Sequence, residues 1–179
     1  METERLCLRR FIPDDWQDLF DYLSQDAVVK YEPYEVYSKE AARQEAERRS
    51  KDNSFWAVCL KPDGKLIGNI YLDERSFSTW ELGYVFSVYF QGRGYATEAV
   101  CTLVDDVFKN QNARRVVAMC NPLNEPSWKL LERLGFRKEG HLIQNIYFKE
   151  DSKGSPIWAD TYEYAILADE WKSRTRCII

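Results

Sequence analysis

The stretch Gln91-Gly92-Arg93-Gly94-Tyr95-Ala96 lies where a strand pattern gives way to a helix pattern. Its two glycines let the backbone turn sharply and leave the N–H groups uncovered by side chains. The helix that follows begins with unpaired amides and with the positive end of its dipole. We therefore predict that the loop and the helix together bind a phosphate or diphosphate group.

The predicted strand before this loop separates bulky from small side chains, because alternate residues of a strand share a face. The bulky face, which we expect in the core, carries Trp80, Leu82, Tyr84, Phe86 and Val88. The other face, which suits the floor of a cleft, carries Glu81, Gly83, Val85 and Ser87.

The segment after the loop predicts an amphipathic helix that ends near Asn110. Its apolar residues keep an i, i+3, i+4 spacing from Ala96 to Phe108. A Walker loop would continue with Gly-Lys-Ser/Thr, whereas Tyr95 and Ala96 follow Gly94, so nucleotide hydrolysis is not expected. A Rossmann loop needs G-x-G-x-x-G after the first strand of its domain, which this mid-chain loop does not offer.

The composition indicates one compact domain. The 179 residues are 45% hydrophobic and 15% aromatic, enough for one good core. A net charge of −4 without a Lys/Arg-dense stripe argues against nucleic-acid binding. No apolar run approaches the length of a membrane span and no signal-peptide pattern opens the chain, so we expect a cytoplasmic protein, monomeric or homodimeric, without membrane contact.

The cysteines and the single histidine indicate neither disulfides nor a metal site. The five cysteines are scattered without a C-x-x-C pair, and we expect reduced, mostly buried thiols. They are Cys7, Cys59, Cys101, Cys120 and Cys177. His141 lacks the clustered partners that zinc requires, so no metal is expected.

The remaining patterns predict a mixed α/β fold in one domain over 1–171, followed by a tail over 172–179. Predicted strands cover Arg5–Arg10, Phe55–Leu60, Lys65–Leu72, Trp80–Val88, Arg115–Cys120, Gly140–Phe148 and Tyr162–Leu167, with Lys149–Ser155 as a hairpin tip. The other predicted helices cover Pro13–Leu23, the stretch from a Ser38 cap to Lys51, and the stretch from an Asn124 cap to Gly135. Helical crossovers in the second half predict parallel strand pairing near the loop and antiparallel hairpins before it.

The loop and several other segments resemble the GNAT superfamily of N-acetyltransferases over nearly the whole chain. Gln91–Ala96 matches its Q/R-x-x-G-x-G/A acetyl-CoA signature. Glu81–Tyr84, Asn121–Ser127 and Asp160–Leu167 are similar to the RimJ/RimL-like branch, which is named for enzymes that acetylate N-terminal amines of ribosomal proteins. The resemblance implies a central mixed, mostly antiparallel sheet of about six or seven strands, splayed at an acetyl-CoA cleft and flanked by about four helices.

The resemblance also implies direct transfer of an acetyl group from acetyl-CoA to a primary amine, either a protein N-terminus or a small molecule, without a metal. It places the diphosphate on the loop amides and the pantetheine arm along the strand edge at Phe86, Ser87 and Val88, in contact with Asn124 and Ser127. Two alternatives remain: a noncatalytic acyl-CoA-binding sensor, and a structural domain whose loop holds no ligand.

An attacking amine must be neutral, which at pH 7 costs about 1.4 kcal/mol for an α-amine of pKa near 8 and about 4.6 kcal/mol for a lysine. Glu81 is the candidate base, by strand parity and by its match to the glutamate of the branch; the alternative is a structural ion pair. By the resemblance, Ser127 is a catalytic residue that lies near the thioester sulfur and donates to the leaving thiolate, and the alternative is a first-turn serine that satisfies helix amides. No tyrosine lies between Asn124 and Phe136, where many members of the superfamily carry a tyrosine acid, so the identity of the general acid stays open.

The segment between the first two predicted helices alternates aromatic and acidic residues. In the resembled fold it overhangs the acceptor cleft, where such a lining favours an amine-bearing acceptor. The residues concerned are Tyr31, Glu32, Tyr34, Glu35 and Tyr37, with Tyr147, Phe148 and Trp158 as a candidate opposite wall. The alternative is a loop that packs its aromatic rings on the sheet. Ribosomal-protein N-termini, polyamines and amino sugars all remain open as acceptors.

Overall fold

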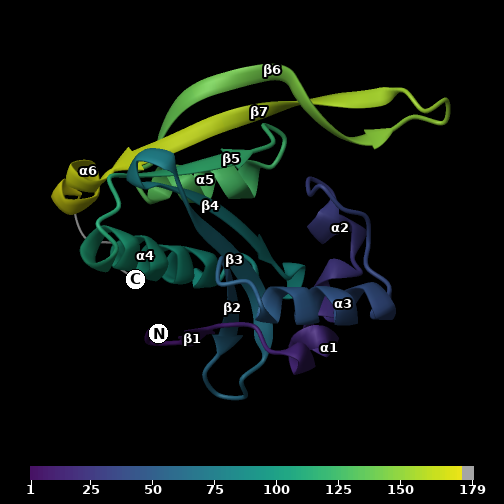
Figure 1. The fold of residues 1–179 in the computed structure, drawn as a ribbon, viewed down its shortest axis with the longest axis horizontal. Helices are drawn as coiled ribbons and strands as arrows, with labels where there is room; N and C mark the ends of the chain where they lie inside the picture. The colour runs from purple at the N-terminus through teal and green to yellow at the C-terminus, as the bar shows by residue number, and fades with distance from the viewer. Residues whose placement is uncertain (175–179) are drawn as a thin grey trace.

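A computed structural model describes residues 1–174 and contains a seven-stranded sheet with strand order β1-β2-β3-β4-β5-β7-β6 (Figure 1). The strands are β1 Leu6–Arg9, β2 Phe55–Leu60, β3 Leu66–Arg75, β4 Thr79–Phe86, β5 Arg115–Cys120, β6 Arg137–Glu150 and β7 Pro156–Leu167. All neighbouring strands are antiparallel except β4 and β5, which are parallel. The predicted mixed, mostly antiparallel sheet is therefore confirmed.

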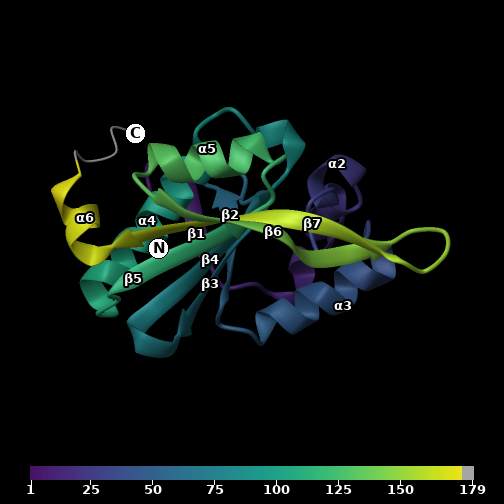
Figure 2. The ribbon, with the colours of Figure 1, turned by 90° about the horizontal axis from the view of Figure 1, so that it is seen from above.

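The helices lie on both faces of the sheet, with α5 on one side and α3 on the other (Figure 2). They are α1 Trp16–Leu23, α2 Asp26–Val29, α3 Lys39–Ser50, α4 Tyr95–Asn110, α5 Glu125–Arg133 and α6 Ala168–Ser173. Short 3-10 turns cover Pro13–Asp15, Ser76–Ser78 and Val88–Phe90. The short α2 and α6 were not predicted. The predicted tail began at Lys172, but Lys172 and Ser173 are the last two residues of α6. The part of the predicted tail beyond Arg174 lies outside the described residues.

Two apolar clusters hold the layers together, one on each face. The bulky face of β4 packs with α4 and α5: Leu82 and Phe86 are buried there, and Trp80 and Tyr84 are partly buried. On the other face, Val85 is buried with residues of α1 and α3. The predicted parity of β4 is confirmed, although α1 and α3 cover some of the face that we expected to be open.

The parallel pair β4–β5 opens at one end. Its register runs from Thr79↔Arg115 to Leu82↔Ala118 and stops there. Beyond this point β4 continues to Phe86 and β5 continues to Cys120 without pairing to each other. Strand β4 ends at Phe86 instead of Val88, because the chain turns into the 3-10 segment Val88–Phe90. The sheet therefore splits next to the glycine loop.

Strands β6 and β7 form a long two-stranded arm that projects past the body of the sheet (Figure 1). Strand β7 pairs with β5 only from Tyr162 onward. The strands are longer than predicted, so the hairpin tip is shorter than Lys149–Ser155: β6 includes Lys149 and Glu150. The polar and charged residues of the arm obscure the alternation on which the sequence prediction depends, because both faces of the arm are exposed.

Candidate active site

The loop after β4 presents its backbone without side-chain cover. Gly92 and Gly94 have φ of 71° and 81°, which lie in the left-handed region. Gly94 is the N-cap of α4, and no side chain caps this helix end. The unpaired amides and the dipole of the 16-residue α4 therefore meet at the loop, which is the arrangement that binds phosphate groups.

An ion pair between a buried carboxylate and an arginine holds the loop in place. Glu98, in the first turn of α4, is 1% exposed, and its Oε2 lies 2.6 Å from the guanidinium of Arg5. Arg5 also donates to the carbonyl of Arg93 at 2.9 Å, so the N-terminal segment holds the loop backbone directly. The hydrogen bonds from Thr3 and Arg5 hold the pKa of Glu98 below its usual range against the opposing effect of burial.

A cavity of about 430 Å³ lies between this loop and α5. Its lining residues are Phe86, Phe90, Gln91, Gly92, Gly94, Tyr95, Ala96, Thr97, Pro126, Leu130 and Arg133. On the α5 side, Lys129 is paired with Glu125, whereas Arg133 has no ion-pair partner among residues 1–174. A cation therefore faces the uncapped amides of the loop across the cavity.

Most of the residues predicted to bind the coenzyme lie on this cavity. Phe86, Gln91, Gly92, Gly94, Tyr95 and Ala96 line it. Arg93 is exposed beside it. Ser87 instead lines another pocket, between α1 and the turn before the glycine loop, and its N–H donates to the carbonyl of Ile67. Val88 lines neither this pocket nor the cavity at the loop. Coenzyme contacts of Ser87 and Val88 stay predictions.

Asn124 and Ser127 lie where β5 passes into α5. Asn124 is the N-cap residue of α5, but its side chain makes no capping hydrogen bond. Ser127 Oγ donates to the Tyr84 hydroxyl at 3.1 Å, and that hydroxyl donates to the Ser127 carbonyl at 2.8 Å. Strand parity predicts Tyr84 in the core but does not predict this contact, because parity gives the face of a side chain and not how far its hydroxyl reaches.

The predicted base, Glu81, is held by an arginine. Arg75 donates to Glu81 Oε2 at 2.9 Å and to Asp73 at 2.8 Å. Glu81 Oε1 has no hydrogen-bond partner among the described residues, and the side chain is 38% exposed. The ion pair that the alternative interpretation expected is therefore present, and the role of Glu81 as base stays a prediction.

The predicted acceptor loop contacts both the coenzyme side and the arm. The Tyr31 hydroxyl donates to the carbonyl of Leu123 in the β5–α5 loop at 3.1 Å. Glu35 lies 3.6 Å from Lys149 of the arm. Burial raises the pKa of Glu32 to about 7, despite a hydrogen bond from Tyr34 and the charge of Arg49, which lower it.

The predicted aromatic residues of the acceptor side form two separate ring pairs. Tyr34 and Tyr37 meet edge to face at 5.3 Å and pack with the α1–α3 core, as the alternative interpretation of the loop expects. Tyr147 and Trp158 form a similar pair at 5.3 Å on the arm. Phe148 is also exposed there. Acceptor contacts of Tyr31, Tyr34 and Tyr147 stay predictions.

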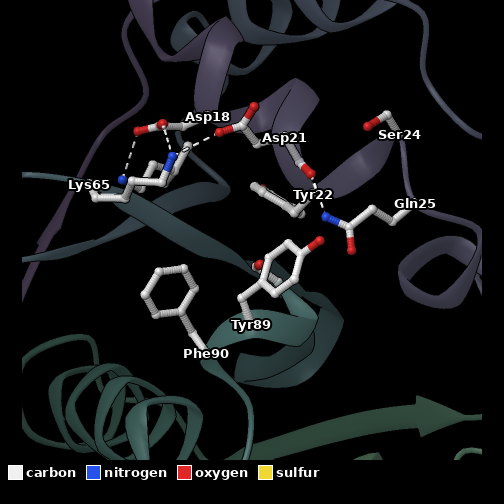
Figure 3. Close-up of a pocket in the computed structure, with 10 residues that line it drawn as sticks. Asp18, Asp21, Tyr22, Ser24, Gln25, Lys65, Tyr89 and Phe90 are labelled. Carbon is white, nitrogen blue, oxygen red and sulfur yellow. Dashed lines mark hydrogen bonds and ion pairs between the residues drawn. The ribbon is translucent and has the colours of Figure 1, made fainter.

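A second pocket of about 390 Å³ lies between α1 and the turn before the glycine loop (Figure 3). Asp18 and Asp21 point toward Lys65, at 2.7 and 2.8 Å, and Tyr89 and Phe90 form the facing wall. Both carboxylates pair with the one lysine, so the pocket keeps an excess of one negative charge. It was not predicted, and of the predicted site residues only Ser87 lines it.

The described residues of the chain contain no group of three or more His, Cys, Asp or Glu residues arranged to hold a metal. His141 is instead hydrogen-bonded to Asp160 at 2.9 Å. The four cysteines within residues 1–174 form no disulfide, and Cys177 lies outside that range. No helix in this range is long and apolar enough to cross a membrane.

Comparison with known proteins shows the family to which the chain belongs. The family model of the acetyltransferase (GNAT) domain matches residues 5–137. The uncharacterized N-acetyltransferase YnaD of Bacillus subtilis is 36% identical over 94% of this chain and 97% of its own length. The [ribosomal protein uS5]-alanine N-acetyltransferase of Escherichia coli is 29% identical over 70% of this chain and 63% of its own. A crystal structure of a GNAT-family acetyltransferase from Bacillus anthracis superimposes with a TM-score of 0.85 at 32% identity, covering 94% of this chain and 98% of that one.

The chain belongs to the GNAT acetyltransferase family, and the protein is an N-acetyltransferase. The predicted superfamily is thus confirmed, and the match to the uS5-alanine enzyme agrees with the RimJ/RimL-like branch. Three residues that shape the site were missed: Arg5, Arg75 and Glu98. A carboxylate in the first turn of the helix was the available signal for Glu98, but no local pattern pairs it with Arg5, 93 positions away.

Proposed function

We propose that the protein transfers an acetyl group from acetyl-CoA to a primary amine within a ternary complex. The main observation is the cavity that runs from the uncapped loop of α4 to Phe86 and Pro126, next to the split between β4 and β5. Its two ends suit an extended anionic thioester: positive backbone amides at one end, and a narrow opening in the sheet at the other.

The residues of the cavity fit acetyl-CoA. The amides of Gly92 to Ala96, with Arg133 opposite, bind the diphosphate. The edge of β4 beyond Leu82 pairs with the amide groups of the pantetheine arm as it would with a further strand. The Asn124 side chain, which makes no capping hydrogen bond to α5, hydrogen-bonds the same arm. When bound, acetyl-CoA supplies an activated acyl group, so the protein needs no covalent nucleophile.

The chain's own residues then prepare the amine. Glu81 Oε1, the carboxylate oxygen that Arg75 leaves free, accepts a proton from the acceptor ammonium, directly or through water. Arg75 fixes the carboxylate in position, as a well-placed base requires. The acidic and aromatic acceptor loop, with Glu32 and Tyr34, attracts a cationic acceptor to the same side of the sheet.

Calorimetry with acetyl-CoA tests the coenzyme site. We expect Gly94→Val to abolish binding, because a Cβ at Gly94 meets an Arg5 nitrogen at 3.2 Å and a side chain covers the amides. Gly64→Val is the matched control: Gly64 has a similar φ of 71° but lies in the β2–β3 turn with nothing within 4 Å of its Cβ. Equal affinities for the two variants would refute the site.

An acetyl-transfer screen tests turnover and the acceptor. It should include peptides with different N-terminal residues, among them an alanine N-terminus, together with polyamines and amino sugars. Transfer to any amine class supports the enzyme and identifies the acceptor. Tight acetyl-CoA binding without transfer to any of these amines would favour the noncatalytic sensor.

A further inference from the structure

A partly buried tyrosine and a serine meet beside the residues that line the coenzyme cavity. The Tyr84 hydroxyl accepts from Ser127 Oγ at 3.1 Å and donates to the Ser127 carbonyl at 2.8 Å. Tyr84 comes from β4 and Ser127 from α5, so the pair bridges the two elements that flank the split. Among the described residues, no other tyrosine hydroxyl bonds to the first turn of α5. The Tyr164 hydroxyl also contacts this helix, but it bonds to Glu132 near the other end.

The position of this pair follows from its neighbours. Phe86 and Pro126 line the cavity. Tyr84 shares a strand face with Phe86, and Ser127 follows Pro126 on α5, although neither of the two lines the cavity itself. Tyr84 also lies just past Leu82, the last residue of β4 that pairs with β5. A thioester whose diphosphate end lies on Gly92–Ala96 thus has its sulfur directed toward the Tyr84 hydroxyl.

We propose that Tyr84 is a catalytic residue whose hydroxyl donates a hydrogen bond to the departing coenzyme sulfur, with Ser127 as its positioning residue. This inference rests on the proposed function. The amine nitrogen forms the C–N bond, the C–S bond breaks, and its electron pair stays on sulfur as a thiolate. The hydroxyl hydrogen of Tyr84 turns from the Ser127 carbonyl to this sulfur, while Ser127 Oγ–H continues to donate to the tyrosine oxygen.

The hydroxyl donates without losing its proton. Burial raises the pKa of Tyr84 well above its ordinary value of about 10, whereas an alkyl thiol has a pKa of about 8.5. Proton transfer from the phenol to the thiolate is therefore unfavourable, and hydrogen bonding to the charged sulfur is favourable. The nitrogen loses two protons: Glu81 takes the first before the attack, and the second leaves the nitrogen after the C–N bond has formed. One of the two reaches the thiolate through water and the other passes to the solvent. This assignment supplies the tyrosine that the α5 sequence lacks.

Binding of reduced CoA and of desulfo-CoA, which has no thiol, tests the assignment without any acceptor. In the unmodified protein, we expect the ratio of the desulfo-CoA Kd to the CoA Kd to rise roughly tenfold between pH 7 and pH 9.5, as the thiolate forms and accepts the hydrogen bond. Tyr84→Phe should make this ratio nearly independent of pH. Ser127→Ala should reduce the rise, and Tyr164→Phe, which also removes a core hydroxyl facing α5, should keep it.

The outcomes separate this inference from the proposed function. If CoA binds but its advantage over desulfo-CoA does not grow with pH, or grows equally in Tyr84→Phe, the role of Tyr84 is refuted and the acetyl-CoA site stands. If neither compound binds the unmodified protein, both proposals are refuted. Circular dichroism establishes whether Tyr84→Phe is folded. If it is not, Ser127→Ala decides the case: a rise that is reduced but still present leaves Tyr84 as the donor, whereas complete loss makes Ser127 itself the donor and refutes the role of Tyr84.

Discussion

Glu32 provides a quantitative test of the acceptor loop. Its carboxyl is desolvated beside Tyr34, and its pKa is raised from 4.5 to about 7. A carboxyl whose pKa is higher in the folded than in the unfolded state binds more protons when folded, so stability falls as the pH rises through 4.5 to 7. We predict that Glu32→Gln, which keeps the shape and removes the charge, abolishes this loss.

The magnitude follows from the two pKa values. With 4.5 unfolded and about 7 folded, the native protein loses about 2.5 kcal/mol between pH 5 and pH 8 relative to Glu32→Gln. Access of water to the loop lowers this figure, so we expect about 1 to 2.5 kcal/mol.

Urea denaturation of both proteins at pH 5, 6, 7 and 8 measures the difference. Glu35→Gln is the control, because Glu35 lies three residues further along the same loop with its side chain 75% exposed. The stability difference for Glu32→Gln should grow with pH and level off above pH 7.5. A difference independent of pH, or the same slope for Glu35→Gln, would show that Glu32 is not desolvated.

Three further substitutions test the base, the loop support and the core. Glu81→Gln should lower kcat by about 100- to 10,000-fold at pH 7 with coenzyme affinity kept, and less at pH 9 where amines are already neutral; an unchanged pH–rate profile removes Glu81 from this role. Arg5→Ala removes the guanidinium from the buried Glu98 carboxylate, which keeps its hydrogen bonds from Thr3 and from the backbone N–H of residue 5, and should cost about 1 to 3 kcal/mol in urea denaturation; a loss below about 0.5 kcal/mol contradicts that pairing. Leu131→Ala, at 1% exposure, should cost about 2 to 5 kcal/mol, whereas Leu123→Ala, at 75% exposure, should cost little.

The local features of the site could be predicted from the sequence. Glycine spacing after an alternating strand identified the loop, because both signals act over a few residues. The same alternation correctly placed Glu81 on the face of β4 opposite the buried Leu82. The Ser38 cap was also correct: its Oγ accepts from the Ala41 amide at 3.1 Å.

Contacts between distant residues could not be predicted. Arg75 reaches Glu81 only because β3 and β4 pair with Asp73 opposite Glu81, a register that no local pattern specifies. Tyr84 has the parity of a core residue, and its second role arises because β4 and β5 stop pairing after Leu82. Helix α6 is six residues long, which is too short for a periodic signal.

The arm formed by β6 and β7 has a consequence for how the molecule behaves at high concentration. Strand β6 is the last of the sheet, and an uninterrupted outer edge invites another chain to add itself indefinitely. Three register shifts, at Lys138/Gly140, Leu142/Ile146 and Tyr147/Lys149, together with a left-handed Gln144, break that edge into short pieces. The enzyme can thereby present aromatic rings on a projecting ribbon without serving as a template for fibrils.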